Sequence, residues 1–322
     1  MYCQYCGEEI DDGARRCAAC GRLVPVSGRG PWPPLFLVTL LAFVALGIWH
    51  LQSGGGQKVA ETVGESVEEA ALLPARYELP ARFGDLGPRL VAAGAIDEKR
   101  FVQTYEAAGQ PLSAAQLNVL RQGSEESIVV DGENAYFLLN FFWAVGLVNE
   151  NPLLTEGPLM EAAGGDVGRF ASVGGWTLGH KAPRDLYAGA ALIPLTAEQQ
   201  ARVEEVAYGV YRPCCNNHTA FADCNHGMAM LGLLELMAAQ GATVQEMFQA
   251  AKYTNAFWYP QQARETAIFF QKTMNLAYEE VEPRMAVGRE AFSGAGFQQV
   301  HQWLVANEAL PQPSGGGNSC GV

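Results

Sequence analysis

Apolar and polar positions divide the chain into one long apolar run near the N-terminus and a series of helix-period segments after it. Residues 35–51 are apolar except for Thr39 and His50, and a tryptophan lies at each end of the run. A helix of this length just crosses a hydrocarbon layer of roughly 30 Å. We therefore expect a transmembrane helix over residues 35–52. The alternative is a signal peptide, but no clean small-x-small cleavage site follows the run.

From about residue 76 onward the pattern is mainly that of helices. Apolar residues recur at helical spacing, and several segments begin at a Ser or Thr that precedes a Glu or Gln. Ile128–Val130 could form a short strand, and the glycine-rich stretch 164–194 is expected to form a loop or cap over the helices. The predicted fold class is mainly α, with an all-α or mostly α domain. The expected helices cover residues 86–93, 98–108, 113–122, 133–148, 196–211, 228–240, 243–257, 261–276 and 297–305.

Proline and glycine mark the boundaries between the predicted domains. A Pro-rich and Gly-rich linker precedes the apolar run, a second linker follows it, and a glycine-rich tail containing Cys320 ends the chain. The expected organisation is a cysteine-rich segment over 1–24, a linker over 25–34, the transmembrane helix over 35–52, a linker over 53–75, the helical domain over 76–310 and a flexible tail over 311–322.

The distribution of charged residues predicts how the chain is oriented in the membrane and argues against one class of partner. The formal net charge is −13, and the acidic excess lies beyond residue 30, so we expect no nucleic-acid partner. Arg15, Arg16, Arg22 and Arg29 precede the apolar run, whereas Lys58 alone follows it closely. By the positive-inside rule, this predicts a single-pass protein of the cell membrane with a cytoplasmic N-terminus and an extracytoplasmic helical domain.

The first cysteine group has the spacing of a structural zinc site. Cys3 and Cys6 form one Cys-x-x-Cys-Gly sequence, and Cys17 and Cys20 form another. Four thiolates at this spacing bind zinc tetrahedrally and leave no open position for catalysis; two disulfides are the alternative. Residues 1–24 closely resemble the N-terminal zinc ribbons of many prokaryotic membrane proteins. We expect a small cytoplasmic ribbon that contacts a protein partner.

A second group of thiol, imidazole and carboxylate side chains lies in residues 213–227. Pro213 must end the preceding helix, and Asp223 or Asn225 is a plausible N-cap for the next one. The positive end of that helix favours a thiolate at Cys224. The candidate ligands for copper or zinc are Cys214, Cys215, His218, Cys224 and His226, with Asp223 supporting them or capping the helix.

Two other interpretations of these residues stay open. Cys224 could form a disulfide with Cys214 or Cys215 that staples a structural domain. It could also act as the attacking thiolate of an extracytoplasmic thiol-disulfide oxidoreductase, with Cys214 or Cys215 resolving the mixed disulfide. No hydrolase or nucleotide-binding motif is present, so an enzymatic role is not the leading expectation.

Residues 213–224 resemble the signature of the PCYCGC-motif proteins, which are membrane-anchored extracytoplasmic lipoproteins of bacteria. The similarity consists of Pro213-Cys214-Cys215, then His218, then Asp223-Cys224. This chain has Cys-Cys-Asn-Asn where that family alternates its cysteines, and an apolar run where the family has a lipidated cysteine. The resemblance implies an anchored metal or thiol module. The leading hypothesis is therefore a membrane-anchored protein for metal handling or sensing.

Overall fold

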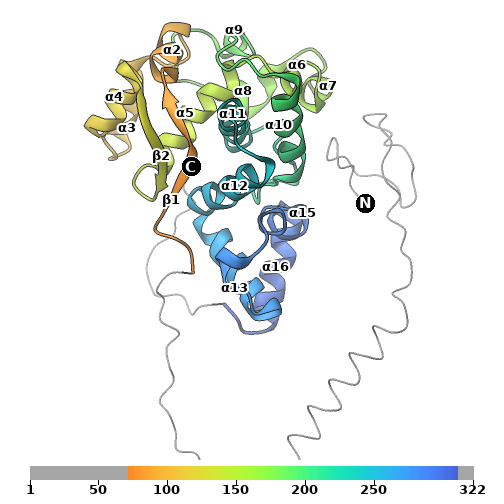
Figure 1. Ribbon diagram of the computed structural model, residues 1–322. Coiled ribbons are helices and arrows are strands. Elements are labelled where there is room, and N and C mark those ends of the chain that lie inside the picture. Colours follow the sequence, from red (N-terminus) through yellow and green to blue (C-terminus); the bar gives the residue numbers. More distant parts are fainter. Residues whose placement is uncertain (1–71, 311–322) are drawn as a thin grey trace, which may run out of the picture.

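The computed structural model describes residues 72–310, which form a mainly helical domain (Figure 1). The predicted zinc ribbon, both predicted linkers except the last residues of the second, the apolar run over 35–52 and the C-terminal tail lie outside the described residues.

Two buried helices form the centre of the domain. Helix α5 (Ala135–Val148) and helix α11 (Asn225–Ala239) make the most extensive contact between any two described elements. Their backbones meet at Gly146 and Gly232, where a Cβ atom would lie 2.1 Å from the Met228 carbonyl oxygen and 2.5 Å from the Phe142 carbonyl oxygen, respectively. No side chain larger than hydrogen fits between the helices at these two positions.

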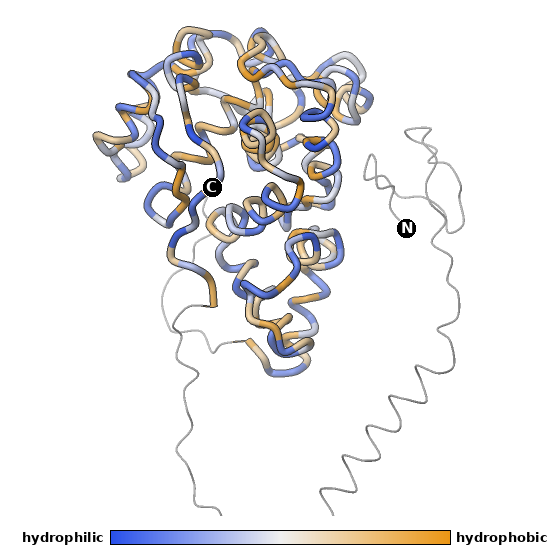
Figure 2. The backbone as a smooth tube through the Cα atoms, in the orientation of Figure 1, coloured by the Kyte–Doolittle hydropathy of each residue, from blue (hydrophilic) through white to orange (hydrophobic). Residues whose placement is uncertain are grey.

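The other helices surround this pair. Figure 1 shows α13, α15 and α16 grouped below α12, and α6, α7 and α10 on the side of the domain away from the strands. Hydrophilic and hydrophobic residues alternate along these outer helices, as expected for elements with one buried face (Figure 2). Their bounds are α2 (Leu86–Ala93), α3 (Glu98–Ala107), α4 (Ala114–Gln122), α6 (Pro152–Thr155), α7 (Pro158–Ala163), α8 (Ala171–Gly174), α9 (Pro183–Leu186), α10 (Ala197–Gly209), α12 (Val244–Trp258), α13 (Pro260–Met274), α14 (Pro283–Ala286), α15 (Arg289–Phe292) and α16 (Gly294–Ala306), with 3₁₀ turns η1 (Val167–Arg169) and η2 (Tyr278–Glu280).

Several helices begin where the sequence predicted. Ser113, Thr196 and Thr243 each cap a helix through a complete capping box. The glycine-rich stretch 164–194 contains only η1 and the short helices α8 and α9. Helix α11 begins earlier than expected, at Asn225, which makes Cys224 its N-cap residue.

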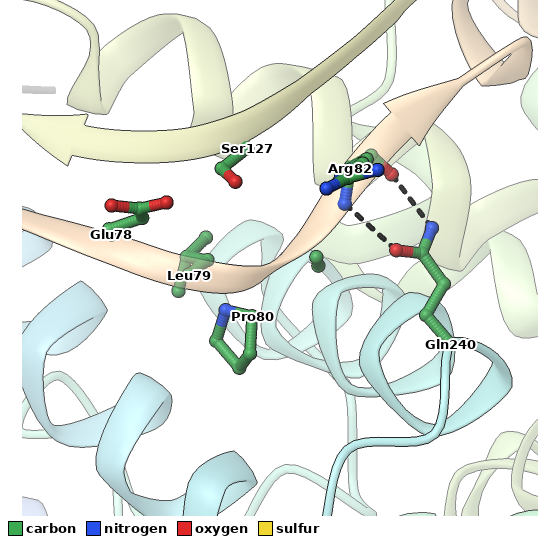
Figure 3. Close-up of a pocket in the computed structure, with 7 residues that line it drawn as sticks. Glu78, Leu79, Pro80, Arg82, Ser127 and Gln240 are labelled. Atoms are coloured by element: carbon green, nitrogen blue, oxygen red, sulfur yellow. Dashed lines mark hydrogen bonds between the residues drawn. The ribbon is translucent and has the colours of Figure 1, made fainter.

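The domain is mainly helical, as expected, but of the two forms predicted it is the mostly α one, because a two-stranded antiparallel sheet is also present. Strand β1 (Arg76–Gly84) pairs with β2 (Ser124–Asp131), so β2 extends beyond the short strand predicted there. The register slips around Pro80, which cannot donate a backbone hydrogen bond. An open pocket of about 600 Å³ lies at this bulge, and Gln240 closes one side by binding both the amide and the carbonyl of Arg82 (2.9 and 2.8 Å; Figure 3).

The predicted single-pass fold, its membrane partner and its location in the cell membrane also need correction. Within residues 72–310, no helix is both long and apolar enough to cross a membrane. The longest helices include α11, α12 and α13 with 15 residues each, or about 22 Å at 1.5 Å per residue, which is short of a roughly 30 Å hydrocarbon layer. The apolar run that carried the prediction, residues 35–52, lies outside the described part of the chain.

Candidate thiol centre

The candidate site is built on the segment that connects α10 to α11. Several backbone hydrogen bonds fix this segment. Among them, the Thr219 amide donates to the Val210 carbonyl (2.8 Å), and the Cys215 carbonyl accepts from the Gly294 amide (2.6 Å). The second bond joins the segment to the start of α16. The loop is therefore held between its own first residues and a helix that is distant in sequence.

The structure brings the three predicted thiols together. Cys214, Cys215 and Cys224 are near enough for each to shift the pKa of the other two, and none of them forms a disulfide. Cys214 is exposed and the other two are half-buried. The sulfur of Cys214 also lies 3.2 Å from the hydroxyl of Tyr259. We refer to these three cysteines as the thiol centre.

Arg212 lies behind the thiol centre and organises the loop. Its side chain is 1% exposed, and it donates to the carbonyls of His218 (3.1 Å) and Phe221 (3.0 Å) and to the carboxylate of Asp223 (2.7 Å). A Cβ atom on Gly227 would lie 2.5 Å from its Nη1, so the guanidinium also contacts the first turn of α11. One buried cation thus joins both ends of the loop.

Sequence reasoning did not include Arg212 in the site. It stands directly between Tyr211 and Pro213, and a basic residue next to two cysteines in an acidic domain is the signal that could have indicated it. Its importance comes from contacts with residues six to eleven positions further along the chain, which no local pattern reveals.

The thiol centre has an uneven charge distribution. Contacts with Cys214 and Cys215 hold the pKa of Cys224 well below its ordinary value, although burial opposes this, and Arg212 lowers it further. The same contacts, together with burial, raise the pKa of Cys214. The side chain of Cys224 makes no regular capping hydrogen bond, but the Gly227 amide is close enough to favour its thiolate. The arrangement therefore favours one thiolate supported by two thiols.

The electrostatics of Arg212 and Asp223 are coupled to these sulfurs. Burial alone would lower the pKa of the Arg212 guanidinium. The pKa is nevertheless raised, because the negative charges of Cys224, Cys215 and Asp223 outweigh the effect of burial. Burial raises the pKa of Asp223, and Arg212 opposes that shift. A hydrogen bond from Asn217 (2.8 Å) satisfies the second carboxylate oxygen. Asp223 is therefore held by Arg212 and Asn217, and its supporting role at a metal site stays a prediction.

The two predicted histidines have aromatic neighbours. The ring of His218 is buried and packs against the rings of Tyr208 (4.8 Å) and Tyr211 (5.8 Å). The ring of His226 stacks on Tyr259 at 4.5 Å, which places it one ring away from Cys214. Burial lowers the pKa of His226 to about 4, so this imidazole is neutral at physiological pH.

Metal binding by the loop remains a prediction after these observations. Within the part of the chain that the structure describes, no group of three or more His, Cys, Asp or Glu side chains already has the arrangement of a metal site. The sulfur of Cys214 is in contact with the Tyr259 hydroxyl, and Asp223 is engaged by Arg212 and Asn217. Metal binding would therefore require the thiols to lose their protons and to exchange these contacts for bonds to the ion.

Comparison with known proteins bears on the N-terminus alone. Residues 2–24 match the family of zinc-ribbon domains, which confirms the ribbon expected over residues 1–24 and supports zinc binding there. Neither the curated proteins nor the solved structures contain a match to this chain. The zinc-ribbon match covers a small part of the sequence, so the function of the helical domain has to be argued from its own residues.

Proposed function

We propose that the thiol centre binds copper(I) or zinc and that the protein serves in metal handling or sensing. The observation that carries this proposal is the presence of three free cysteines in the loop before α11, near enough to shift one another's pKa values. Thiolates are the ligands that these two ions prefer. Because a disulfide would require two of the sulfurs to be bonded, three free thiols in one loop favour metal binding over simple stapling.

Each residue of the site has a definable part in this proposal. Cys214, Cys215 and Cys224 supply the sulfur ligands, and Arg212 offsets part of their negative charge when they lose their protons. His226 is the neighbouring nitrogen donor. Its Nδ1 lies 3.0 Å from the Asn225 side-chain oxygen, so a proton on Nδ1 would leave Nε2 available as a ligand. His218 contributes through its carbonyl, which accepts from Arg212.

The N-terminal ribbon provides a separate zinc site. Cys3, Cys6, Cys17 and Cys20 are the proposed ligands, because their spacing is that of a closed four-thiolate site and the family match covers all four. A closed site of this kind contributes folding energy and performs no chemistry on a substrate. The protein would therefore bind metal at two places with different roles.

Elemental analysis of the full chain, purified without chelator, tests the proposal. We expect about two metal ions per chain, and about one in the Cys215→Ser/Cys224→Ser variant, which retains the ribbon. The Cys320→Ser variant is the matched control, because it removes a thiol outside the thiol centre. Equal metal content in the double variant and the control would reject metal binding by the thiol centre.

A second function is favoured by the exposure of Cys214 beside the Cys224 thiolate. In thiol–disulfide exchange, Cys224 would attack a substrate disulfide and expel one substrate thiolate, giving a mixed disulfide. Cys214 or Cys215 would then attack the Cys224 sulfur, release the second substrate thiol and leave a disulfide in the loop. Alkylation of the native metal-free protein across a pH series tests this idea: a reactive Cys224 should be modified well below the pH at which Cys320 reacts.

A further inference from the structure

The open pocket of about 600 Å³ lies where strand β1 departs from regular pairing with β2 (Figure 3). The ladder between the two strands pairs Glu78 with Val129. It next pairs Arg82 with Ser127, so the three residues of β1 between these pairs have no partner in β2. Residues inside a bulge leave backbone N–H and C=O groups outside the ladder. The pocket therefore offers backbone groups that a ligand can use.

The side chain of Gln240 indicates what kind of group this part of β1 binds. Its amide oxygen accepts from the Arg82 amide at 2.9 Å, and its amide nitrogen donates to the Arg82 carbonyl at 2.8 Å. A residue of a neighbouring antiparallel strand makes the same two bonds with the residue opposite to it. One carboxamide of the protein thus already occupies the place of a peptide group at one end of the pocket (Figure 3).

Two opposite charges flank the pocket. Burial alternates along β1 through the bulge, and Glu78, Pro80 and Arg82 lie on its exposed side. Glu78 and Arg82 are four residues apart, which corresponds to about 13 Å along an extended strand. Figure 3 shows the carboxylate and the guanidinium at opposite ends of the pocket, with Pro80 between them. The charges therefore match a ligand that has a positive group at one end and a negative group at the other.

We propose that this pocket binds a short extended peptide of about three or four residues with free termini. The peptide runs parallel to β1: its ammonium group pairs with Glu78, its carboxylate pairs with Arg82, and its peptide groups bond to the backbone of the bulge. An extended chain spans at most about 3.3–3.6 Å per residue, so three or four residues match the separation of the two charges. A single amino acid or a dipeptide is too short to reach both.

Isothermal titration calorimetry of the full chain with tetra-alanine tests this inference. We expect one peptide to bind per chain. Acetylating the amino terminus of the peptide, or amidating its carboxyl terminus, should each weaken binding about two- to fivefold, because an ion pair that is open to solvent contributes only modestly. Dialanine should bind more weakly than tetra-alanine, since it reaches only one of the two charges.

Variants of the two charged residues determine which terminus each one binds. In Glu78→Gln, acetylation of the peptide should no longer change the affinity, whereas amidation should still weaken it. In Arg82→Met, the pattern should be reversed. Glu126→Gln, at an exposed position of β2 outside the pocket, is the matched control and should keep both losses. Comparing the losses between variants isolates each pair of charges. Circular dichroism would show that the variants keep their fold.

Two results would each overturn the inference. One is that tetra-alanine does not bind at millimolar concentration. The other is that acetylation and amidation weaken binding equally in Glu78→Gln, Arg82→Met and the control, because the termini would then be recognised elsewhere. No cysteine takes part in the proposed binding, so neither result depends on whether the thiol centre binds a metal.

Discussion

The two ends of α11 bury ionisable groups in opposite ways. At the N-terminal end, Arg212 is buried beside Asp223 and the thiols, and these groups keep it charged. Toward the C-terminal end, Glu235 is 0% exposed, and its partner is the Asn151 amide, which donates to Oε1 at 2.7 Å. Burial raises the pKa of Glu235 well above its ordinary value, and the amides only partly oppose the shift.

This contrast separates a buried polar group beside the proposed metal site from one that belongs to the core. Glu235 has neutral partners, so it remains protonated and acts as one more hydrogen-bonding group of the core. Arg212 has opposite charges around it, including thiols that gain stability as thiolates. The same helix therefore presents ionic chemistry at one end and neutral packing at the other.

Removing Arg212 should have the largest effect on this contrast. Arg212→Met leaves Asp223 and two carbonyls without their shared partner, so we expect the free energy of unfolding to fall by about 3–5 kcal/mol. Urea denaturation measures this change. Arg121→Met is the control, because its ion pair with Glu98 is exposed to solvent and should contribute little to stability. Equal losses in both variants would mean that the N-terminal end of α11 does not depend on a buried charge.

The middle of α11 should respond to packing and not to charge. In Gly232→Ala, the added methyl group would lie 2.5 Å from the Phe142 carbonyl oxygen, so α5 and α11 must separate at a cost of about 1–3 kcal/mol. Gly132→Ala is the matched control, since nothing lies within 4 Å of a Cβ atom there. Thermal or urea unfolding would compare the two. A Gly232→Ala protein as stable as Gly132→Ala would contradict the close helix contact.

The C-terminal end of α11 is attached to the sheet through Gln240. Gln240→Ala removes the two hydrogen bonds to the backbone of Arg82, and because these bonds are exposed we expect a loss of about 1 kcal/mol. Gln245→Ala, at an exposed position of α12, is the control. Faster hydrogen exchange at the Arg82 amide would confirm that the loss is local. Unchanged exchange there would exclude the attachment.

The smallest change in stability at low pH is expected from replacing Glu235. Above about pH 4.5 the unfolded chain releases the Glu235 proton while the folded protein keeps it, so the unfolded state binds fewer protons. The free energy of unfolding should therefore fall as pH rises from 4.5 toward the raised pKa of the folded state. Glu235→Gln should remove this fall and change stability at pH 4 by less than about 1 kcal/mol. An identical pH dependence in the two proteins would show that Glu235 is not held protonated.

The sequence by itself determined those features that depend only on residues close together along the chain. Ser113, Thr196 and Thr243 fix the starts of their helices, because a capping box is complete within four residues. The spacing of the first four cysteines likewise defines a zinc ribbon. The position of three cysteines in one loop was also visible, since the proline after Arg212 must end a helix.

Only the tertiary structure decided which groups meet. Strand β1 was missed because its pairing with β2 joins segments about forty residues apart, and Pro80 interrupts its alternation. The place of Arg212 behind the thiols, and of His226 on Tyr259, depends on how α11, α12 and the loop pack together. Side chains that are distant in sequence come into contact only after the core has formed. The order of cysteines and histidines along the chain therefore did not reveal which residues they contact in the folded domain.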